Sequence, residues 1–262
     1  RYVSYVAMGG NDRLSPDAVR KAMDEYEAEN DCAGMYQDPI IVYHDAKDPA
    51  FDTFFRMGIC RHPAEIYRPG NTLVLFFLPY REDIVESNRG GTATSDQWLT
   101  AYKKGTGLIM RINRAIRNTL ESRGRLVSCL NTPIDWNEKK AAEEWSFKLA
   151  SYLAGMGEFS TAGSFVTAKG FGGRFSGIIT DEVLYEEKPQ TRTPEEYEAM
   201  IADIKKATLY EGAPSEECIA ACPCRAISKD GIDRFKCQQH CRTLNEYVPS
   251  ADACGKCFFT AK

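Results

Sequence analysis

The chain has 262 residues, of which 43% are hydrophobic and 27% charged, as in an ordinary globular protein. This composition excludes a disordered chain, a collagen and a coiled coil, and the length allows one large domain or one domain with a small appendage. The longest apolar run, residues 73–78, is far shorter than the roughly 20 residues of a membrane-spanning helix. The formal net charge is −4, and no block of Lys and Arg predicts binding to nucleic acid.

Helices and strands are predicted in an irregular order over the first 180 residues. Pro16 at a first helical position marks the first helix, and the nearly continuous apolar run that ends at Pro79 predicts a strand buried on both faces. No strand–helix–strand alternation repeats, so the predicted fold class is α+β. In chain order the pattern predicts a helix from residue 16, an irregular segment over 31–70, a strand over 71–78, a helix over 108–120, a strand over 126–130, a helix over 142–153, and strands over 164–167 and 175–180.

A predicted helix that begins after Thr193 links this body to the rest of the chain. Thr193-Pro194-Glu195-Glu196 has the capping-box pattern with Pro at the first helical position, which predicts a helix to about Ala207. We therefore expect two domains, residues 1–207 and residues 208–262.

The cysteines are concentrated in the second of these domains. Cys32, Cys60 and Cys129 are scattered through the body and are expected to act as small apolar side chains. A cluster at one end of a long chain indicates a metal site in a reducing compartment rather than a disulfide framework, which favours the cytoplasm. The chain begins at Arg1, so a leader removed earlier is compatible with this expectation. The clustered cysteines are Cys218, Cys222, Cys224, Cys237, Cys241, Cys254 and Cys257.

The spacing of these cysteines matches part of a bacterial ferredoxin pattern. Cys218-x3-Cys222-Pro223 is the second half of the run C-x2-C-x2-C-x3-C-P. In two-cluster proteins, the Cys before Pro in this run ligates a different cluster from the other three cysteines. Three ligand positions of one cluster are held by Gly212, Ser215 and Ala261, so that cluster is expected to be lost. The complementary set predicts one [4Fe–4S] cluster on Cys222, Cys237, Cys254 and Cys257, with Cys218, Cys224 and Cys241 as bystanders.

Two other interpretations of the cysteines stay open. Cys237-x3-Cys241 with Cys254-x2-Cys257 has the spacing of a four-cysteine zinc site. Free thiols without a metal are the second alternative, although so short a tail has little core of its own. The Arg-Ala-Ile that follows the Cys-Pro-Cys sequence favours iron–sulfur over zinc.

Several further segments, taken in order, resemble the cobalamin-dependent iron–sulfur reductases, the superfamily of epoxyqueuosine reductases and reductive dehalogenases. The similar segments are 145–148 (WSFK), 154–159 (AGMGEF), 165–167 (FVT), 173–181 (GRFSGIITD) and 231–237 (GIDRFKC). The resemblance implies a nitroreductase-like, cobalamin-binding domain followed by a ferredoxin-like tail whose cluster relays electrons to the corrin. The residues that it implies in contact with cobalamin are Gly155, Gly157, Glu158, Phe159, Gly172, Gly173, Arg174, Phe175, Ser176, Gly177 and Ile178. Asp-x-His-x-x-Gly, the motif of proteins that ligate cobalt through His, is absent, so no protein imidazole ligand is expected.

The sequence departs from the resembled family at the proton donor. Asn131-Thr132-Pro133 stands where the family has an Asp, and an amide cannot act as a general acid. Asp135 is the nearest candidate acid, but an Asp in front of a helix more often caps it. No tRNA-binding repeat or basic face is recognisable, so no nucleic-acid partner is expected.

Three functions are therefore compared. The first is a corrinoid-dependent reductase of a small molecule, supplied by an external low-potential electron donor. The second is a protein that binds, reduces or passes on a corrinoid without a further substrate. The third is a flavin-dependent nitroreductase-like protein with an iron–sulfur tail. Tyr80, Trp98 and Tyr102 are candidates for a pocket wall, although isolated aromatic residues usually belong to the core. The sequence does not indicate an oligomeric state.

Overall fold

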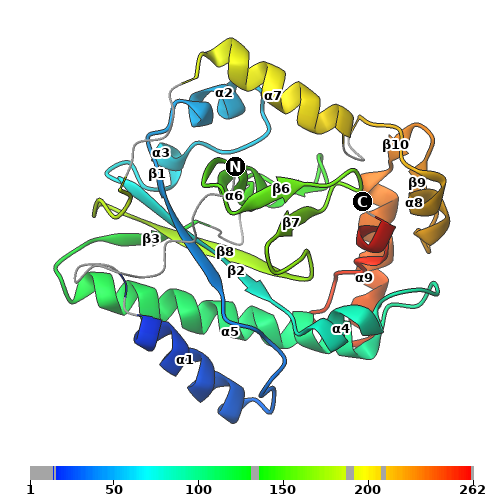
Figure 1. Ribbon diagram of the computed structural model, residues 1–262, viewed down its shortest axis with the longest axis horizontal. Coiled ribbons are helices and arrows are strands. Elements are labelled where there is room, and N and C mark those ends of the chain that lie inside the picture. Colours follow the sequence, from blue (N-terminus) through cyan, green and yellow to red (C-terminus); the bar gives the residue numbers. More distant parts are fainter. Residues whose placement is uncertain (1–13, 15, 131–135, 187–191, 208–210, 261–262) are drawn as a thin grey trace.

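A computed structural model describes residues 14, 16–130, 136–186, 192–207 and 211–260. At its centre lies a four-stranded sheet with the order β1-β2-β8-β3, in which all neighbouring strands are antiparallel (Figure 1). All eight residues of β2 are buried, which confirms the predicted strand with two buried faces. The bounds are β1 (Ile40–Asp45), β2 (Thr72–Pro79), β3 (Val127–Cys129) and β8 (Gly173–Thr180).

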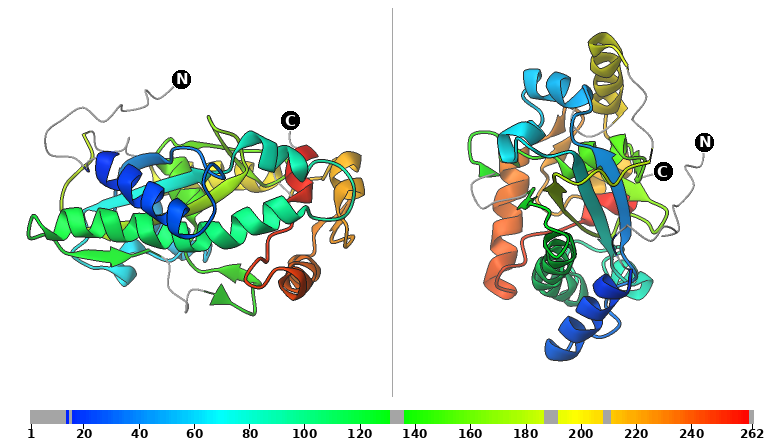
Figure 2. Two further views of the ribbon diagram at one scale, coloured as in Figure 1. Left: turned by 90° about the horizontal axis from the view of Figure 1, so that it is seen from below. Right: turned by 90° about the vertical axis from the view of Figure 1, so that its left-hand side faces the viewer.

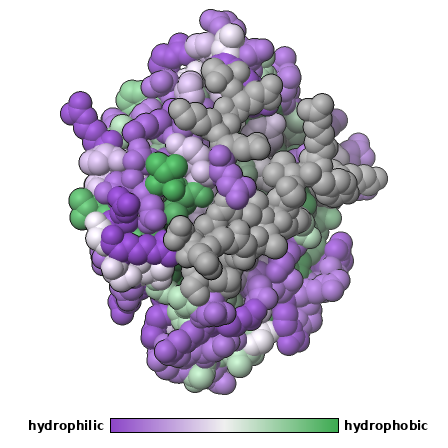
Figure 3. Space-filling view, turned by 60° about the vertical axis from the view of Figure 1, so that its left-hand side comes forward, coloured by the Kyte–Doolittle hydropathy of each residue, from purple (hydrophilic) through white to green (hydrophobic). Residues whose placement is uncertain are grey.

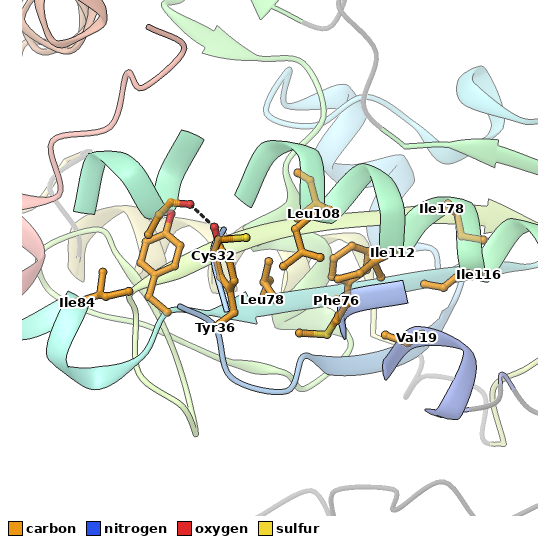
Figure 4. Close-up of a cluster of buried hydrophobic side chains, with 14 of the residues drawn as sticks. Val19, Cys32, Tyr36, Phe76, Leu78, Ile84, Leu108, Ile112, Ile116 and Ile178 are labelled. Carbon is orange, nitrogen blue, oxygen red and sulfur yellow. Dashed lines mark hydrogen bonds between the residues drawn. The ribbon is translucent and has the colours of Figure 1, made fainter. Parts of the chain in front are cut away.

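Two helices, α1 (Pro16–Glu29) and α5 (Asp96–Glu121), cover one face of the sheet (Figure 2). The residues of α5 at steps of four are buried against β2 and β8, as their spacing predicts. The Tyr36 hydroxyl also donates a 2.7 Å hydrogen bond to the carbonyl oxygen of Ala101. Figure 4 shows the apolar side chains of this layer: Val19, Phe76, Leu78, Leu108, Ile112, Ile116 and Ile178.

The opposite face of the sheet is covered by α2 (Ala50–Arg56), α6 (Phe147–Leu153) and α7 (Pro194–Ala207). Phe51 and Trp145 stack with ring centroids 5.9 Å apart, and both side chains are fully buried. The result is a three-layer body with the sheet between two sets of helices.

A buried polar network attaches α7 to this body. The Asp48 carboxylate lies 2.8 Å from His44 Nε2 and accepts a 3.0 Å hydrogen bond from the Tyr197 hydroxyl. At the start of α7, the Thr193 amide donates to Glu196 Oε2 at 2.7 Å, and the Glu196 amide donates to Thr193 Oγ1 at 3.3 Å. These reciprocal bonds confirm the predicted capping box.

Short elements complete the body. β6 and β7 form a separate antiparallel hairpin in which Glu158 faces Val166 across the pair. The bounds are α3 (Pro63–Ile66), α4 (Glu82–Ser87), β4 (Trp136–Asn137), β5 (Ala142–Glu143), β6 (Gly157–Phe159) and β7 (Phe165–Thr167).

The cysteine-rich tail lies beside one end of the sheet, at the right of Figure 1. Its α9 packs Leu244 into the same buried layer as α5. The bounds are α8 (Glu216–Ala221), β9 (Ile227–Ser228), β10 (Gly231–Ile232), α9 (Arg234–Tyr247) and the 3-10 helix η2 (Lys256–Thr260).

The α+β class is confirmed, but two predicted segments are wrong. Residues 31–70 are not irregular, because they contain β1, α2 and α3. β1 was missed because its apolar run is short and ends in His44 and Asp45, which are buried polar residues. The helix predicted over 142–153 starts only at Phe147, because Ser146 caps it by accepting from the Leu149 amide. Ala142–Glu143 instead pairs with β4.

Among the residues that the structure describes, no helix is long and apolar enough to cross a membrane. Among the coloured residues of the face shown in Figure 3, hydrophilic side chains predominate.

Candidate functional site

The tail brings its cysteines together from three segments. Cys218, Cys222 and Cys224 lie on α8 and the turn after it, Cys237 and Cys241 lie on α9, and Cys254 precedes η2, which contains Cys257. Ser215 stands where the ferredoxin pattern has a cysteine. It is the N-cap of α8 and accepts a 3.2 Å hydrogen bond from the Cys218 amide. Ser215 therefore has a structural role at this position.

Cys222 and Cys224 form the first pair of thiols. Their sulfur atoms lie 3.7 Å apart, and the Cys222 sulfur accepts a 3.2 Å hydrogen bond from the Ala226 amide. Burial and then the neighbouring Cys222 thiol raise the pKa of Cys224 to about 11. Amide-to-sulfur hydrogen bonds of this kind stabilise negative charge on the sulfurs of an iron–sulfur site.

Cys237 and Cys241, one helical turn apart on α9, form the second pair. A hydrogen bond between the two thiols, together with burial, raises the pKa of Cys237, and the same bond lowers the pKa of Cys241. The thiols of Cys257 and Cys224 make smaller contributions that also raise the pKa of Cys237.

Cys254 and Cys257 form the third pair. Burial raises the pKa of Cys257 to about 12, with further contributions from the thiols of Cys254 and Cys222. Burial also raises the pKa of Cys254, which is only 9% exposed. Neighbouring thiols thus add to the effect of burial on both residues of this pair.

The chemistry of this donor set fits an iron–sulfur cluster, because soft thiolates are its usual ligands. Among the described residues, no group of three or more Cys, His, Asp or Glu side chains stands close enough to hold a metal ion as it is. Direct thiol contacts join Cys222 to Cys224 and Cys237 to Cys241.

The segment that carries Cys254 is anchored in the body by polar contacts. The Asn88 side-chain amide donates to the Cys254 carbonyl at 2.9 Å, and Trp98 Nε1 donates to the Ala253 carbonyl at 3.0 Å. Lys256 Nζ donates to the carbonyls of Asn88 and Gly90 at 2.8 and 2.7 Å. Nothing in the local sequence marks Asn88 or Trp98 as tail contacts, because their partners are more than 150 residues away.

Aromatic contacts fix the next residues of the tail. Phe171, in the glycine-rich turn before β8, meets Phe258 and Phe259 with ring centroids 6.0 and 5.0 Å apart. Lys148 Nζ lies 5.5 Å from the centre of the Phe258 ring and donates to the Gly163 carbonyl at 3.0 Å. The predicted cofactor-binding turn is thus in direct contact with the tail.

The β6–β7 hairpin also reaches the cysteines. Its tip residue Ala162 is buried in one small apolar cluster with Cys218 and Ile227, against which Cys222 and Cys257 pack. The loop that follows Gly157, Glu158 and Phe159 therefore belongs to the apolar cluster against which two of the predicted cluster ligands pack.

The residues predicted to contact cobalamin on β8 divide between the two faces of the sheet. Arg174 donates to the Tyr102 carbonyl at 2.8 Å and to Thr106 Oγ1 at 3.0 Å, while Ser176 accepts from Asn113 at 2.8 Å. These contacts, like those of Ile178, are made with the α5 layer. Phe175 packs on the opposite face, with its ring 5.7 Å from that of Phe165.

The glycines of these segments are explained by packing within the chain. A Cβ on Gly177 would lie 2.4 Å from the Val74 carbonyl oxygen, and one on Gly173 would lie 2.4 Å from the Leu78 oxygen. A Cβ on Gly157 would similarly meet the Val166 oxygen at 2.2 Å, and one on Gly172 would meet Val85 at 2.5 Å. Close strand pairing thus accounts for the glycines at 157, 173 and 177, whereas at Gly172 the obstacle is the Val85 side chain.

A groove lies beside the other half of the predicted site. It has a volume of about 660 Å³ and is bordered by Glu158 and Phe159 of β6, by Tyr152 of α6, and by α7 residues that include Met200 and Ile204. Gly155, two residues before β6, follows the end of α6 with a φ of 70° and is exposed. The groove is shallow and open to solvent.

The remaining candidates are placed as follows. Tyr80 and Trp98 are buried core residues in edge contact, with ring centroids 5.2 Å apart. Tyr102 is half-buried beneath Arg174, whose guanidinium lies 3.7 Å from the centre of its ring. Asp135, together with residues 131–133, lies outside the described residues.

No family model matches this chain, and no curated protein matches it in sequence. Solved structures provide the comparison. An epoxyqueuosine reductase with an epoxyqueuosine-modified tRNA-Tyr stem loop has a TM-score of 0.49 and 13% identity, over 92% of this chain and 65% of that chain. The epoxyqueuosine reductase from Streptococcus thermophilus has a TM-score of 0.47 and 12% identity, over 92% and 64% of the two chains.

The chain is structurally similar to epoxyqueuosine reductases. It spans less than two thirds of the length of these relatives, and identities of 12 and 13% concern the fold alone.

Proposed function

We propose that this chain is an iron–sulfur oxidoreductase that holds one [4Fe–4S] cluster on Cys222, Cys237, Cys254 and Cys257 and performs reductive corrinoid chemistry on its body. One observation carries the proposal. The β6–β7 hairpin has the predicted cofactor residues on its first strand and buries its tip, Ala162, among tail residues that include the predicted ligands Cys222 and Cys257. A cluster at these cysteines adjoins the cofactor-binding part of the body.

The groove beside β6 supports a cofactor at this part of the body, because it adjoins the predicted residues Glu158 and Phe159. Phe159, Tyr152 and Met200 give it an apolar wall, and Glu158 lies at its side. Cobalamin, when bound, supplies a strongly reducing cobalt centre. Tyr152, Phe159 and Met200 would hold the cofactor by apolar contact. We assign a structural role to Arg174, Ser176 and Ile178 instead, because their side chains contact α5.

The test is anaerobic purification with iron, sulfide and zinc analysis, followed by a visible spectrum after incubation with cobalamin or flavin. We expect about four iron and four sulfide per chain, together with retained cob(II)alamin. Stoichiometric zinc without iron supports the four-cysteine zinc site and contradicts the cluster. Retained flavin contradicts the corrinoid and supports the nitroreductase-like alternative.

A second function is favoured by one feature of the sequence. Asn131 stands where the resembled family has its proton-donating Asp, and a protein that only binds or reduces a corrinoid needs no such donor. Cob(II)alamin reduction without turnover of any small substrate would support this corrinoid-handling function.

A further inference from the structure

One lysine of the body lies beside the predicted ligand Cys257. The Nζ atom of Lys148, in the first turn of α6, donates to the Gly163 carbonyl at 3.0 Å and lies 5.5 Å from the centre of the Phe258 ring. Gly163 follows Ala162, which is buried in the apolar cluster against which Cys257 packs, and Phe258 follows Cys257 in the chain. Two independent contacts therefore place an ammonium group of the body next to this ligand.

The charge of Lys148 acts on the Cys257 sulfur. Burial raises the pKa of Cys257, and the thiols of Cys254 and Cys222 raise it further, whereas the Lys148 ammonium lowers it. Lys148 is half-buried, so water and salt screen its charge less than they screen an exposed one. Within the part of the chain that the structure describes, no carboxylate forms an ion pair with Lys148. Its ammonium is thus available to stabilise negative charge on the sulfur.

A second lysine near the predicted ligands holds the tail in place. Lys256 is only 5% exposed, and its Nζ donates to the carbonyls of Asn88 and Gly90 at 2.8 and 2.7 Å. A change at Lys256 would therefore alter the attachment of the tail together with the charge. At Lys148 the charge can be removed while the attachment through Lys256 stays intact.

We propose that the positive charge of Lys148, fixed beside Cys257, raises the reduction potential of the cluster. This inference rests on the proposed function. Reduction moves one electron from the external low-potential donor, which is oxidised, to the cluster, and no covalent bond forms or breaks. The electron adds one negative charge at the thiolate site, so a nearby cation stabilises the reduced state more than the oxidised state.

The experiment is a redox titration of the full chain after anaerobic reconstitution with iron and sulfide, followed by visible absorption and electron paramagnetic resonance. Lys148→Gln removes the charge but keeps a side chain that can donate to Gly163. We expect its equilibrium constant for reduction to fall about tenfold, which lowers the potential by about 59 mV for one electron. Lys148→Arg keeps the charge and should restore most of the original potential.

Lys47→Gln is the matched control. Lys47 Nζ also makes a hydrogen bond, to Asn71 Oδ1 at 2.6 Å, directly before the start of β2. The tail contacts Phe171 near the other end of β2, where Pro79 pairs with Gly173. Because Lys47 is exposed and the length of the strand separates it from this contact, its loss should leave the potential unchanged.

The outcomes separate the charge effect from cluster assembly and from folding. A chain that holds no iron contradicts the proposed function and this inference with it. About four iron per chain with equal potentials in Lys148→Gln and the original protein contradicts this inference alone. A purely structural role would lower the melting temperature of Lys148→Gln without lowering the potential, and that result also overturns it. A lower potential in Lys148→Gln that is restored in Lys148→Arg supports it.

Discussion

The side-chain amide of Asn88 donates a 2.9 Å hydrogen bond to the carbonyl oxygen of Cys254, across 166 residues of sequence. Asn88 is completely buried, and its Oδ1 accepts from the Ser95 amide at 3.0 Å. One side chain therefore joins the start of α5 to the segment that carries a predicted cluster ligand.

Replacing Asn88 tests this anchor. Asn88→Ala leaves the Cys254 carbonyl and the Ser95 amide without partners, so unfolding by denaturant should show a loss of about 1–3 kcal/mol. The iron content after anaerobic reconstitution should also fall. Asn118→Ala, at an exposed position of α5, should change the free energy of unfolding by less than about 0.5 kcal/mol. Equal stability and equal iron in the two variants would show that the anchor is unimportant.

The cluster assignment is tested by replacing single cysteines. Cys254→Ser should abolish the iron content, because it removes one of four ligands. Cys218→Ala should retain about four iron per chain, although it lowers stability because Cys218 is buried with Ala162 and Ile227. Iron that survives in Cys254→Ser, or disappears in Cys218→Ala with the fold intact, contradicts the assigned ligand set.

Gly177 tests whether the glycines serve packing or the cofactor. Gly177→Ala places a Cβ 2.4 Å from the Val74 carbonyl oxygen in the middle of the sheet, so it should cost about 1–3 kcal/mol or more. Corrinoid binding and iron content should then decline together with the folded fraction. The matched control is Gly105→Ala on α5, where the nearest atoms are 3.5 Å from the new Cβ. If the Gly177→Ala protein is stable and loses only its corrinoid, Gly177 contacts the cofactor.

Arg174 provides a second test of the same division. Its guanidinium lies 3.7 Å from the centre of the Tyr102 ring and donates to two oxygens of α5, so Arg174→Lys should lose about 1–2 kcal/mol of stability. Corrinoid bound per folded molecule, measured by visible absorption after gel filtration, should not change. If the Arg174→Lys variant loses corrinoid but keeps its full stability, the role of Arg174 is not purely structural.

The Asp48 network predicts an acid dependence of stability. Burial by itself raises the pKa of Asp48, but hydrogen bonds from His44, the Ala50 amide and Tyr197 outweigh it and hold this pKa below its usual value. A depressed pKa stabilises the fold fully above the unfolded value of about 3.9, and this contribution is lost as pH falls through the folded value.

Tyr197→Phe removes one of these hydrogen bonds. The variant should be about 1.5–3 kcal/mol less stable at neutral pH, since the lost bond reaches a buried carboxylate. Its stability should depend less on pH below about 4 than that of the original chain. Denaturant unfolding from pH 3 to 7 measures both effects, and parallel pH profiles for the two proteins would exclude this role for Asp48.

The sequence by itself determined the features that depend on local chemistry. The fully apolar run of β2, the steps of four in α5 and the capping box of Thr193 and Glu196 each carry their own signal, because hydrophobic period and helix caps act within a few residues. The set of four cysteines also followed from spacing alone, and it stays a prediction.

Only the tertiary structure decided which distant residues meet. The sequence grouped residues 172–178 as one cofactor surface, but the alternation of side chains along β8 sends Arg174 toward α5 and Phe175 toward α6. Asn88 and Trp98 carried no signal as tail contacts, because hydrogen bonds to backbone carbonyls leave no pattern in the partner's sequence. Contacts between segments over 150 residues apart depend on how the layers pack, and packing is a property of the whole fold.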